Sequence, residues 1–455
     1  MRTTQRRDER RTIAGSCART LVALVLVFAS RTLCAQDAAV ATQPNGLTRL
    51  GEMYARVQRD NPRIAVARAL MRAAEARIPG ATRPPDPQFQ LGFMNYALPR
   101  LAPMPTLGMT QLQVMQMLPL GGKLALAGRV AGAYASAFNE RALDVMWEQR
   151  SQAAMSFYDL YATERALDVT RETLRLLQDI EKTTEAMYRV GDGRQTDVLR
   201  AQVEIAKMAA DTLRMQAMRT TMVAKLNTFL DRGAEAAIGT PELPRFPDLI
   251  PSRGWLDSIA HGERPMIRAG LDAVRGAEAS SRLTQKEIWP DLQVGVQYAQ
   301  RGGEMGTERM GSLMLGASIP IFARDRQLRM REEASAMQQM AEADLAGMRS
   351  ETRGRIGEAH ANLTRARSLA QLYRTTVLPQ AEATVSSAFA AYRVGKVDFM
   401  TLLDDRMTVN KYRQELYAFE ADQGKAWADL EMLVGRALFD PNQTAALSTL
   451  QRGIR

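Results

Sequence analysis

The sequence predicts a mostly helical α+β fold built from a duplicated unit of helix, strand, strand, long helix and returning helix. Only 6% of the residues are aromatic and long stretches lack proline, which is typical of long helices rather than of a wide mixed sheet. The tetrapeptide Tyr-Arg-Val-Gly occurs at 188–191 and again at 392–395, each time between two helical stretches. This recurrence indicates an internal duplication.

Further matches between the two halves keep a steady spacing. Pro119 returns as Pro320, 201 residues later. The other matches share an offset of 203: Pro62 with Pro265, 74–76 with 277–279, Pro87 with Pro290, and 89–92 with 292–295. We therefore divide the chain into a first repeat (47–231), a proline-rich linker (232–254), a second repeat (255–437) and a C-terminal tail (438–455).

The N-terminus is typical of a secretory signal peptide. Residues 1–35 combine a basic start with the apolar run 21–29 and a plausible cleavage site after Ala35. A short buried N-terminal helix is the alternative. Residues 36–46 then form an N-terminal extension. Both cysteines, Cys17 and Cys34, lie in this leader, so the mature chain would have no disulfide, and lipidation of Cys34 stays an open question.

Charge and composition exclude several function classes. The formal charge is +10, but half of it belongs to the leader, and the remaining charges of both signs are interspersed, so we expect no nucleic-acid partner. The two histidines, His261 and His360, lie on polar helical stretches, which disfavours a His-based metal site. Without a nucleophile–base pair or a phosphate-binding loop, we expect neither an enzyme nor a cofactor.

The helices follow from the positions of the prolines. We expect one helix from Leu47 to about Arg83, a long one over 122–189 and a returning one over 195–230. In the second repeat, small or apolar residues from Met330 to Ala370 recur every 3.6 residues, so this helix should be nearly straight. About 65 helical residues make a rod of about 100 Å, which suits a tunnel wall or a stalk.

Four short segments alternate with period two. Phe89, Leu91 and Phe93 oppose glutamine and glycine, and the segments around 109–118, 292–298 and 312–319 behave alike. Strands of this length and pattern suit a membrane barrel with lipid outside and water inside. A half-buried sheet of a soluble protein is the alternative. Four strands cannot close a barrel, so a membrane barrel would have to be shared between chains.

Each Tyr-Arg-Val-Gly motif predicts the tip of a helical hairpin. Gly191 and Gly395 can take the left-handed conformation that ends a helix. Thr196 or Asp197 can then cap the returning helix of the first hairpin. The second long helix contains Pro379, which has no counterpart in the first repeat, and a proline there removes a backbone hydrogen bond and bends the helix.

The chain resembles the TolC family of outer-membrane efflux proteins over most of residues 47–437. The resemblance is carried by four motifs: NPRI…AEA at 61–76, QLQVMQMLPLGGKL at 111–124, YRVG…TDVL…AQ at 188–202, and YRVGKVDFMTLLDDR at 392–406. It implies a homotrimer with one twelve-stranded transmembrane β-barrel in the cell outer membrane. The helices would extend into the periplasm as an α-helical tunnel and conduct substrate passively from a periplasmic adaptor and an inner-membrane RND pump.

The resemblance also implies roles for individual residues. Val190, Gly191, Val394 and Gly395 match the adaptor-contact motif, although Asp192 and Lys396 depart from the small or apolar residue that often follows it. Thr196, Asp197 and Asp404 match positions at the periplasmic aperture, while Thr401 stands where some members have a second Asp. A ring of acids there would favour cations. For Asp197, simple helix capping is an equal alternative. We further hypothesise that Pro379 marks a joint by which the second hairpin swings outward.

The exported substrate is open at this stage. The GGKL turn after Pro119 and the VDFMTLLD tip look more like the heavy-metal branch than like the drug-efflux or protein-secretion channels of the same fold. Soft thioethers suit Cu(I) or Ag(I), but Met is also a common gap-filler. A periplasmic helical adaptor or scaffold is the competing class. The methionines in question flank the strand pairs: Met94, Met104, Met109, Met115, Met117, Met305, Met310 and Met314.

Overall fold

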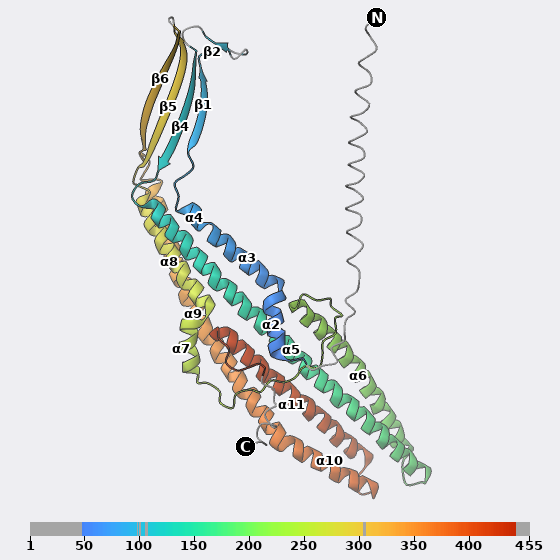
Figure 1. Ribbon diagram of the computed structural model, residues 1–455. Helices are drawn as coiled ribbons and strands as arrows, with labels where there is room; N and C mark the ends of the chain where they lie inside the picture. The colour runs from blue at the N-terminus through green and yellow to red at the C-terminus, as the bar shows by residue number, and fades with distance from the viewer. Residues whose placement is uncertain (1–47, 98, 100–101, 105–107, 304–305, 443–455) are drawn as a thin grey trace, which may run out of the picture.

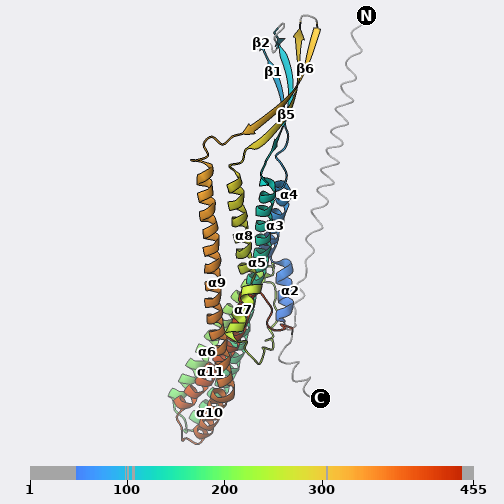
Figure 2. The ribbon, with the colours of Figure 1, turned by 90° about the vertical axis from the view of Figure 1, so that its left-hand side faces the viewer.

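The computed structural model describes residues 48–97, 99, 102–104, 108–303 and 306–442. The predicted signal peptide with both cysteines, the N-terminal extension, Met305 and most of the predicted tail lie outside the described residues. The molecule is long and narrow, with a β-sheet at one end and two helical hairpin tips at the other (Figures 1 and 2).

The order of elements confirms the predicted duplication. The first repeat contains α2 (Leu50–Asp60), α3 (Pro62–Ala76), α4 (Ile78–Ala81), β1 (Gln88–Met94), β2 (Tyr96–Ala97), β3 (Ala102–Pro103), β4 (Met109–Leu118), α5 (Lys123–Arg189) and α6 (Gln195–Phe229). The second contains α7 (Arg253–Glu263), α8 (Pro265–Lys286), β5 (Asp291–Gly303), β6 (Gly306–Ser318), α9 (Gln327–Leu372), the π-helix η1 (Tyr373–Val377), α10 (Leu378–Arg393) and α11 (Phe399–Val434).

The predicted single helix from Leu47 to Arg83 is wrong, because the chain breaks before Pro62. Asn61 has an extended backbone, and its Oδ1 accepts hydrogen bonds from the backbone N–H groups of Arg63 at 2.9 Å and Ile64 at 3.4 Å. A residue before proline avoids the helical conformation, and asparagine caps the helix that follows. The second repeat breaks in the same way before Pro265. The small β2–β3 ribbon was not predicted either.

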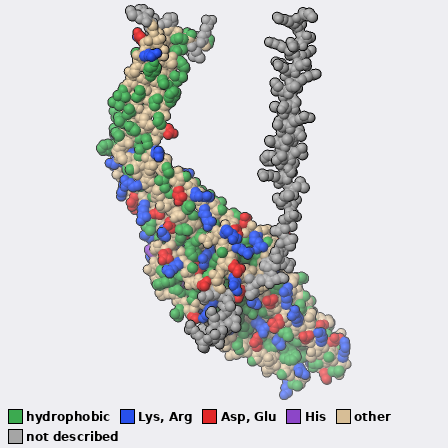
Figure 3. Space-filling model, viewed as in Figure 1, with side chains coloured by type: hydrophobic (Ala, Val, Ile, Leu, Met, Phe, Trp, Pro, Cys, Tyr) green, Lys and Arg blue, Asp and Glu red, His purple; other side chains and the backbone are tan. Residues whose placement is uncertain are grey.

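The four long strands form one antiparallel sheet in the order β1-β4-β5-β6, so the two repeats meet at the β4–β5 pair. The register aligns the predicted apolar faces: Phe89, Val114, Val296 and Leu313 lie in one row across the sheet. These side chains are exposed, and Figure 3 shows apolar side chains gathered on the sheet. Within the described part of the chain, the outer edges of β1 and β6 are unpaired.

Below the sheet, the helices form a wall, in which α5 contacts α3 and α8, and α8 contacts α9. The 67 residues of α5 make a rod of about 100 Å. Shorter helices meet end to end beside it. Gly435, at the left-handed C-terminus of α11, stands against Pro265 at the start of α8, where a Cβ atom would lie 2.6 Å from the proline Cδ. None of the described helices is long and apolar enough to span a membrane.

The predicted apolar stripe of the second long helix is only partly covered within the chain. Its lower part, including Leu345, Ile356 and Leu363, is buried. Its upper part is not, and Met330 and Met337 are 39% and 51% exposed. At the opposite flank of the wall, α3 exposes Val66 and Leu70 to 60% and 53%. Both flanks of the wall therefore present uncovered apolar side chains.

Candidate functional site

The first hairpin tip closes through a left-handed glycine, as predicted. The backbone φ of Gly191 is +86°, and its N–H donates to the Tyr188 carbonyl at 3.1 Å. The N–H groups of Asp192 and Gly193 both donate to the Met187 carbonyl, at 2.9 and 3.1 Å. These bonds satisfy the free carbonyl groups at the end of α5. The side chain of Val190 is 73% exposed at the apex.

The second tip closes in the same manner. The φ of Gly395 is +70°, and its N–H donates to the Tyr392 carbonyl at 3.0 Å. The N–H of Lys396 donates to the Ala391 carbonyl at 3.0 Å. Val394 is 67% exposed, so both tips present an exposed valine beside the turning glycine. Asp192 and Lys396 therefore contribute to the turns through their backbone, and their side chains account for a charge difference between the tips.

The predicted capping of the first returning helix by Thr196 or Asp197 is wrong. The helix begins at Gln195, as expected, but its N-cap is Arg194, which makes no side-chain cap. Thr196 and Asp197 fall in its first turn, where the negative carboxylate of Asp197 interacts favourably with the positive end of the helix dipole. The second returning helix is capped instead by Asp398, whose Oδ1 accepts from the backbone N–H of Thr401 at 3.3 Å.

Thr401 has a capping partner, whereas Asp404 has an exposed side chain. The hydroxyl of Thr401 donates to Asp398 Oδ1, and this bond lowers the pKa of the Asp398 carboxyl. Asp404 lies in the first turns of α11 and is exposed. Thr196 is exposed and Asp197 half-buried on α6. Thr401 and Asp404 thus share one helix start and Thr196 and Asp197 the other.

The two tips are held side by side by an apolar cluster between the hairpins. Leu177, Ile180 and Ala201 of the first hairpin pack with residues of the second, among them Tyr392 and Leu402. Charges also meet across this contact, since the positive charge of Arg194 contributes to lowering the pKa of Asp398. Both views of the ribbon show the tips together at the lower end of the molecule (Figures 1 and 2).

Above the tips, Arg413 of α11 ties the second hairpin to the first. Its Nη1 donates to Glu172 of α5 at 3.1 Å, and its Nη2 and Nε donate to Glu382 of α10 at 2.7 and 3.1 Å. Gln414, one residue further, donates to the Thr170 hydroxyl of α5 at 3.2 Å. The hairpins are therefore joined here by polar bonds that can be exchanged for water, rather than by a continuous apolar core.

Pro379 lies at the start of α10, directly after the π-helix η1. A proline removes one backbone donor, and a π-helical turn is an irregularity in the hydrogen-bond ladder. Two residues of η1 are anchored to α11: the Tyr373 hydroxyl donates to Glu415 at 2.8 Å, and Arg374 donates to Glu420. The corresponding helix of the first repeat, α5, runs without interruption.

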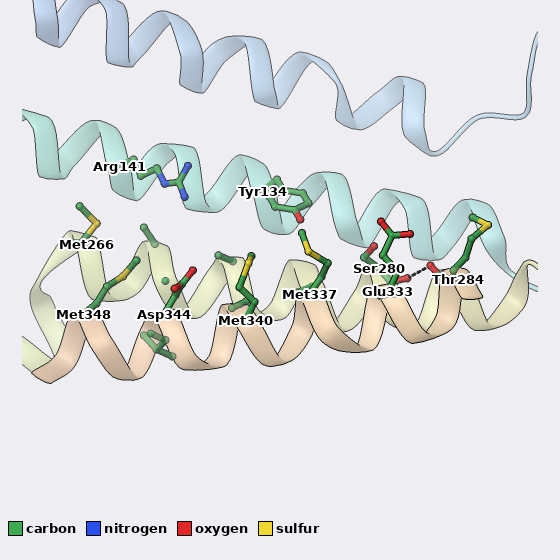
Figure 4. A pocket seen from close by; sticks show the side chains of 18 residues that line it. Tyr134, Arg141, Met266, Ser280, Thr284, Glu333, Met337, Met340, Asp344 and Met348 are labelled. Carbon is green, nitrogen blue, oxygen red and sulfur yellow. Dashed lines mark hydrogen bonds between the residues drawn. The ribbon is translucent and has the colours of Figure 1, made fainter. Parts of the chain in front are cut away.

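A methionine-rich groove of about 480 Å³ lies between α5, α8 and α9. Figure 4 shows Tyr134 of α5 pointing toward Met337 of α9, and Arg141 on α5 at the same groove. Gly270 lets α9 approach α8, because a Cβ atom there would lie 3.0 Å from Leu345 Cδ1. Five thioethers line the groove: Met266, Met330, Met337, Met340 and Met348.

A second groove continues below the first and is strongly charged. Arg264 and Arg355 line it together with four acidic residues, Asp144, Glu148, Glu351 and Asp429. Burial raises the pKa values of Asp144 and Asp429 and lowers that of Arg264. Buried charges of both signs are thus held close together where α11 meets α8.

Both grooves open on the same face of the helical wall. On α5, Phe157 packs in the core that contains α2, while Met155 lines the second groove. On α11, Trp427 packs in the core that contains α7, while Asp429 lines that groove. Residues two positions apart point to different sides of a helix. The extra layer of α2 and α7 therefore covers the opposite face of the wall.

Sequence reasoning missed Asp398, Arg413 and the two grooves. The motif Asp-Phe-Met-Thr at 398–401 carries a capping signal that could have been read locally. Arg413 pairs with residues far apart from it in the sequence, and each groove is lined by residues from several helices. No local sequence pattern therefore predicts them. Among the described residues, His, Cys, Asp and Glu side chains form no group of three that could hold a metal ion.

Comparisons with known proteins find one family and two relatives of similar sequence. The profile of the family described as "Outer membrane efflux protein" matches residues 53–231 and 256–436. The cobalt-zinc-cadmium resistance protein CzcC of Cupriavidus metallidurans is 21% identical over 63% of this chain and 68% of its own length. The outer membrane efflux protein BepC of Brucella suis is 23% identical over 58% of each chain.

Solved structures share the fold. The outer membrane protein VceC of Vibrio cholerae superimposes with a TM-score of 0.73 at 16% identity, covering 86% of this chain and 97% of its own. The structure of CusC gives the same TM-score and identity, covering 89% of this chain and 96% of its own. At these identities the likeness establishes the arrangement of helices and strands.

Proposed function

The chain belongs to the outer membrane efflux protein family, and on that premise we propose that three copies assemble into one passive conduit through the outer membrane. The chain is an efflux channel whose strands lie in the outer membrane and whose helices extend into the periplasm. Its role is to let substrate pass rather than to transform it, so no catalytic residue or cofactor enters the mechanism.

The open β-sheet is the observation that supports the proposed trimer. Its apolar face suits lipid, but β1 and β6 leave unpaired edges, and such edges are not tolerated in a bilayer. Three copies would pair these edges into twelve strands, above the minimum of about eight for a closed barrel. The exposed Val66 and Leu70 of α3 in one wall would then be covered by the flank of the next wall.

The same assembly orients the grooves. The layer of α2 and α7 covers one face of each wall, and placed inside a tunnel it would fill the conduit. The grooved face would therefore line the lumen, with α2 and α7 in the surrounding periplasm. A substrate would pass the charged groove at the α8–α11 junction and then the methionine-rich groove before it enters the barrel.

The tips would form the periplasmic entrance. Val190 and Val394, exposed beside Gly191 and Gly395, would contact the hairpins of a periplasmic adaptor, which would join the channel to an inner-membrane RND pump. Asp404, exposed near the tip, would contribute an acidic ring to the aperture, with Asp197 at its margin. Thr196 and Thr401 would lie close by, Thr401 as a partner of Asp398 in the helix cap.

Opening would be a movement of the second hairpin. It is tied to the first by Arg413 and lies below the π-helix and Pro379, whereas the first hairpin continues the unbroken α5. Rotation about η1 with exchange of the Arg413 bonds for water would widen the aperture, because the second hairpin would leave the three-fold axis.

Heavy-metal cations are the substrate class that we favour. The support is the likeness to CzcC, described as a cobalt-zinc-cadmium resistance protein, together with the exposed Asp404 near the aperture and the methionines along the path. The likeness to BepC leaves drug efflux or protein secretion as the second candidate within the same fold. A soluble periplasmic scaffold is the third.

Assembly and conduction test the proposal directly. The protein purified in detergent should migrate as a heat-modifiable trimer and conduct ions in planar bilayers. A protein that is extracted without detergent and remains a monomer would overturn the proposal.

Adaptor binding is tested separately at the tips. Val190→Asp with Val394→Asp should abolish pull-down of a periplasmic adaptor that the wild type captures, while leaving trimer and conductance intact. Leu249→Asp is the matched control, because Leu249 is 84% exposed in the linker, away from the tips. Adaptor capture that survives the double substitution would remove the tips from the interface.

A further inference from the structure

The polar face of the β-sheet has an unusual set of apolar residues. On this face, across the four described strands, every apolar side chain larger than alanine is a methionine. The opposite face carries phenylalanine, leucine, valine and tyrosine and no methionine. The methionines of the polar face are Met94, Met109, Met115, Met117, Met310 and Met314.

This segregation does not fit methionine used as a general apolar filler. A filler would appear on the lipid-type face, where apolar surface is needed, at least as often as among glutamines and serines. The row next to Met115 reads Gln90, Gln113, Gln297 and Ser312 across the sheet. The thioethers are therefore placed on the surface that would face water in the assembled barrel.

Two of the six methionines converge. Met115 and Met314 are the register partners of Gly295 on its two sides. A Cβ atom on Gly295 would lie 3.1 Å from Met115 Cγ and 3.5 Å from Met314 Cε. Both side chains thus lean over the glycine, which provides the room for them to meet. The amide Nε2 of Gln113 lies 3.9 Å from Met314 Sδ and holds the sulfur in this row.

Thioethers select a narrow class of ligand. They are neutral and soft, and they bind Cu(I) and similar cations, whereas Na⁺, Mg²⁺ and Ca²⁺ prefer oxygen. A thioether has no proton to lose, so binding does not compete with protonation as it does at cysteine or histidine. Weak binding is what a conduit needs, because a tightly held ion would block it.

We propose that Met115 and Met314, converging over Gly295, form a lumenal site for a soft monovalent cation, Ag(I) or Cu(I), in transit through the barrel. The site rests on the proposed function, because its access to the ion depends on a water-filled barrel. Gln88, the register partner of Met115, carries its side-chain amide on the same face of the sheet. The other methionines of the polar face extend the thioether surface toward both ends of the barrel.

Silver titration of the purified full-length protein in chloride-free buffer tests the site. The wild type should bind Ag(I), and Met115→Leu with Met314→Leu should lose about one equivalent per chain at nearly constant side-chain volume. Gly295→Val keeps both sulfurs but fills the space between them, and it should lose the same equivalent. Met104→Leu with Met218→Leu, two exposed methionines off the sheet, is the matched control and should titrate like the wild type.

Conductance of the same preparations separates this site from the function itself. Ag(I) should reduce potassium conductance through the wild type and the control, but not through the two site variants. Unchanged silver stoichiometry in both site variants would overturn the site, even with normal conductance in every preparation. A wild type that binds silver but never conducts would instead contradict the proposed channel and leave the thioether site standing.

Discussion

The two hairpin tips start from the same four residues, yet their tyrosines lie in different surroundings. Tyr188 is 45% exposed, whereas Tyr392 is 6% exposed. The Tyr392 hydroxyl lies 3.2 Å from the buried Thr184 hydroxyl of α5, and its ring lies 6.0 Å from that of Phe399. Identical local sequence therefore makes the same turn in both hairpins. Tertiary packing, however, buries the tyrosine of the second tip against α5 of the first hairpin.

The helices above the tips differ in a matching way. The first hairpin hangs from a single uninterrupted helix, and the second from a helix interrupted by η1 and Pro379. The links between them at Arg413 are polar and partly exposed. In the gating that we propose, the first copy would stay fixed on its continuous helix and the second copy would be released.

Replacing each of the two tyrosines by alanine should give the largest difference in stability between the two hairpin tips. Tyr392→Ala should lower the local stability of the second tip by roughly 3 kcal/mol, because it leaves a cavity between the hairpins. Tyr188→Ala should cost under about 0.5 kcal/mol, as is usual for an exposed side chain. Hydrogen–deuterium exchange of the tip amides measures both, and equal effects would contradict the difference in packing.

Removing the Arg413 bonds should favour the released state. Arg413→Ala should raise single-channel conductance or open probability about tenfold, which corresponds to about 1.4 kcal/mol. Arg214→Ala removes an exposed arginine that pairs with Asp211 within α6, and it should change nothing measurable. If both variants conduct alike in planar bilayers, Arg413 does not hold the second hairpin closed.

Replacing Pro379 tests the interrupted helix itself. Pro379→Ala restores a backbone donor next to η1, so the helix should straighten and resist rotation. We expect opening to decrease about fivefold, or about 1 kcal/mol. Pro247→Ala in the linker is the control. Unchanged opening would remove Pro379 from the gating mechanism and leave the π-helix as a structural irregularity only.

The helix caps should show a smaller difference. Asp398→Ala removes the side-chain cap of α11 and should increase fraying of its first turn by about 1 kcal/mol. Asp197→Ala removes only a favourable charge near the start of α6 and should cost about 0.5 kcal/mol. Exchange rates in the two first turns compare them directly; a larger loss at Asp197 would restore it as a cap.

The smallest effect is a difference in pH response. The pKa of Asp398 is lowered, so its stabilisation is present above its ordinary value of 3.8 and is lost only as the pH falls below that. The pKa of Asp429 is raised by burial, so its contribution is greatest at low pH and is lost as the pH rises through the raised value. Acidification from neutral pH toward 3.8 should therefore slow exchange at the α8–α11 junction, whereas the second tip should respond only below that pH. Equal slowing at both places would contradict this assignment.

Much of the fold could be predicted because it depends on local signals. Alternation over 89–93 and 292–298 indicated the strands and their faces, and the absence of proline over 122–189 indicated α5. The break before Pro62 was missed although the proline itself signals it. The cap at Asp398 was missed because the start of a helix shifts by a residue or two without changing its apolar pattern.

Less of the candidate site could be predicted from the sequence. Exposure of Val190 and Val394 follows from their place in a turn, but the burial of Tyr392 beside an exposed Tyr188 does not follow from identical motifs. The meeting of Met115 and Met314 over Gly295 needs the register of three strands, and the register depends on which edges pair.

The sequence by itself determined the duplicated order of helices and strands, the two faces of the sheet and the glycine turns at both tips, because each depends on residues within a few positions of one another. Only the tertiary structure decided that α11 meets α8 end to end, that Arg413 joins the hairpins, and that Met115 and Met314 converge over Gly295. Those relations depend on packing between segments up to 241 residues apart, as at the Arg413–Glu172 pair, and no local pattern encodes them.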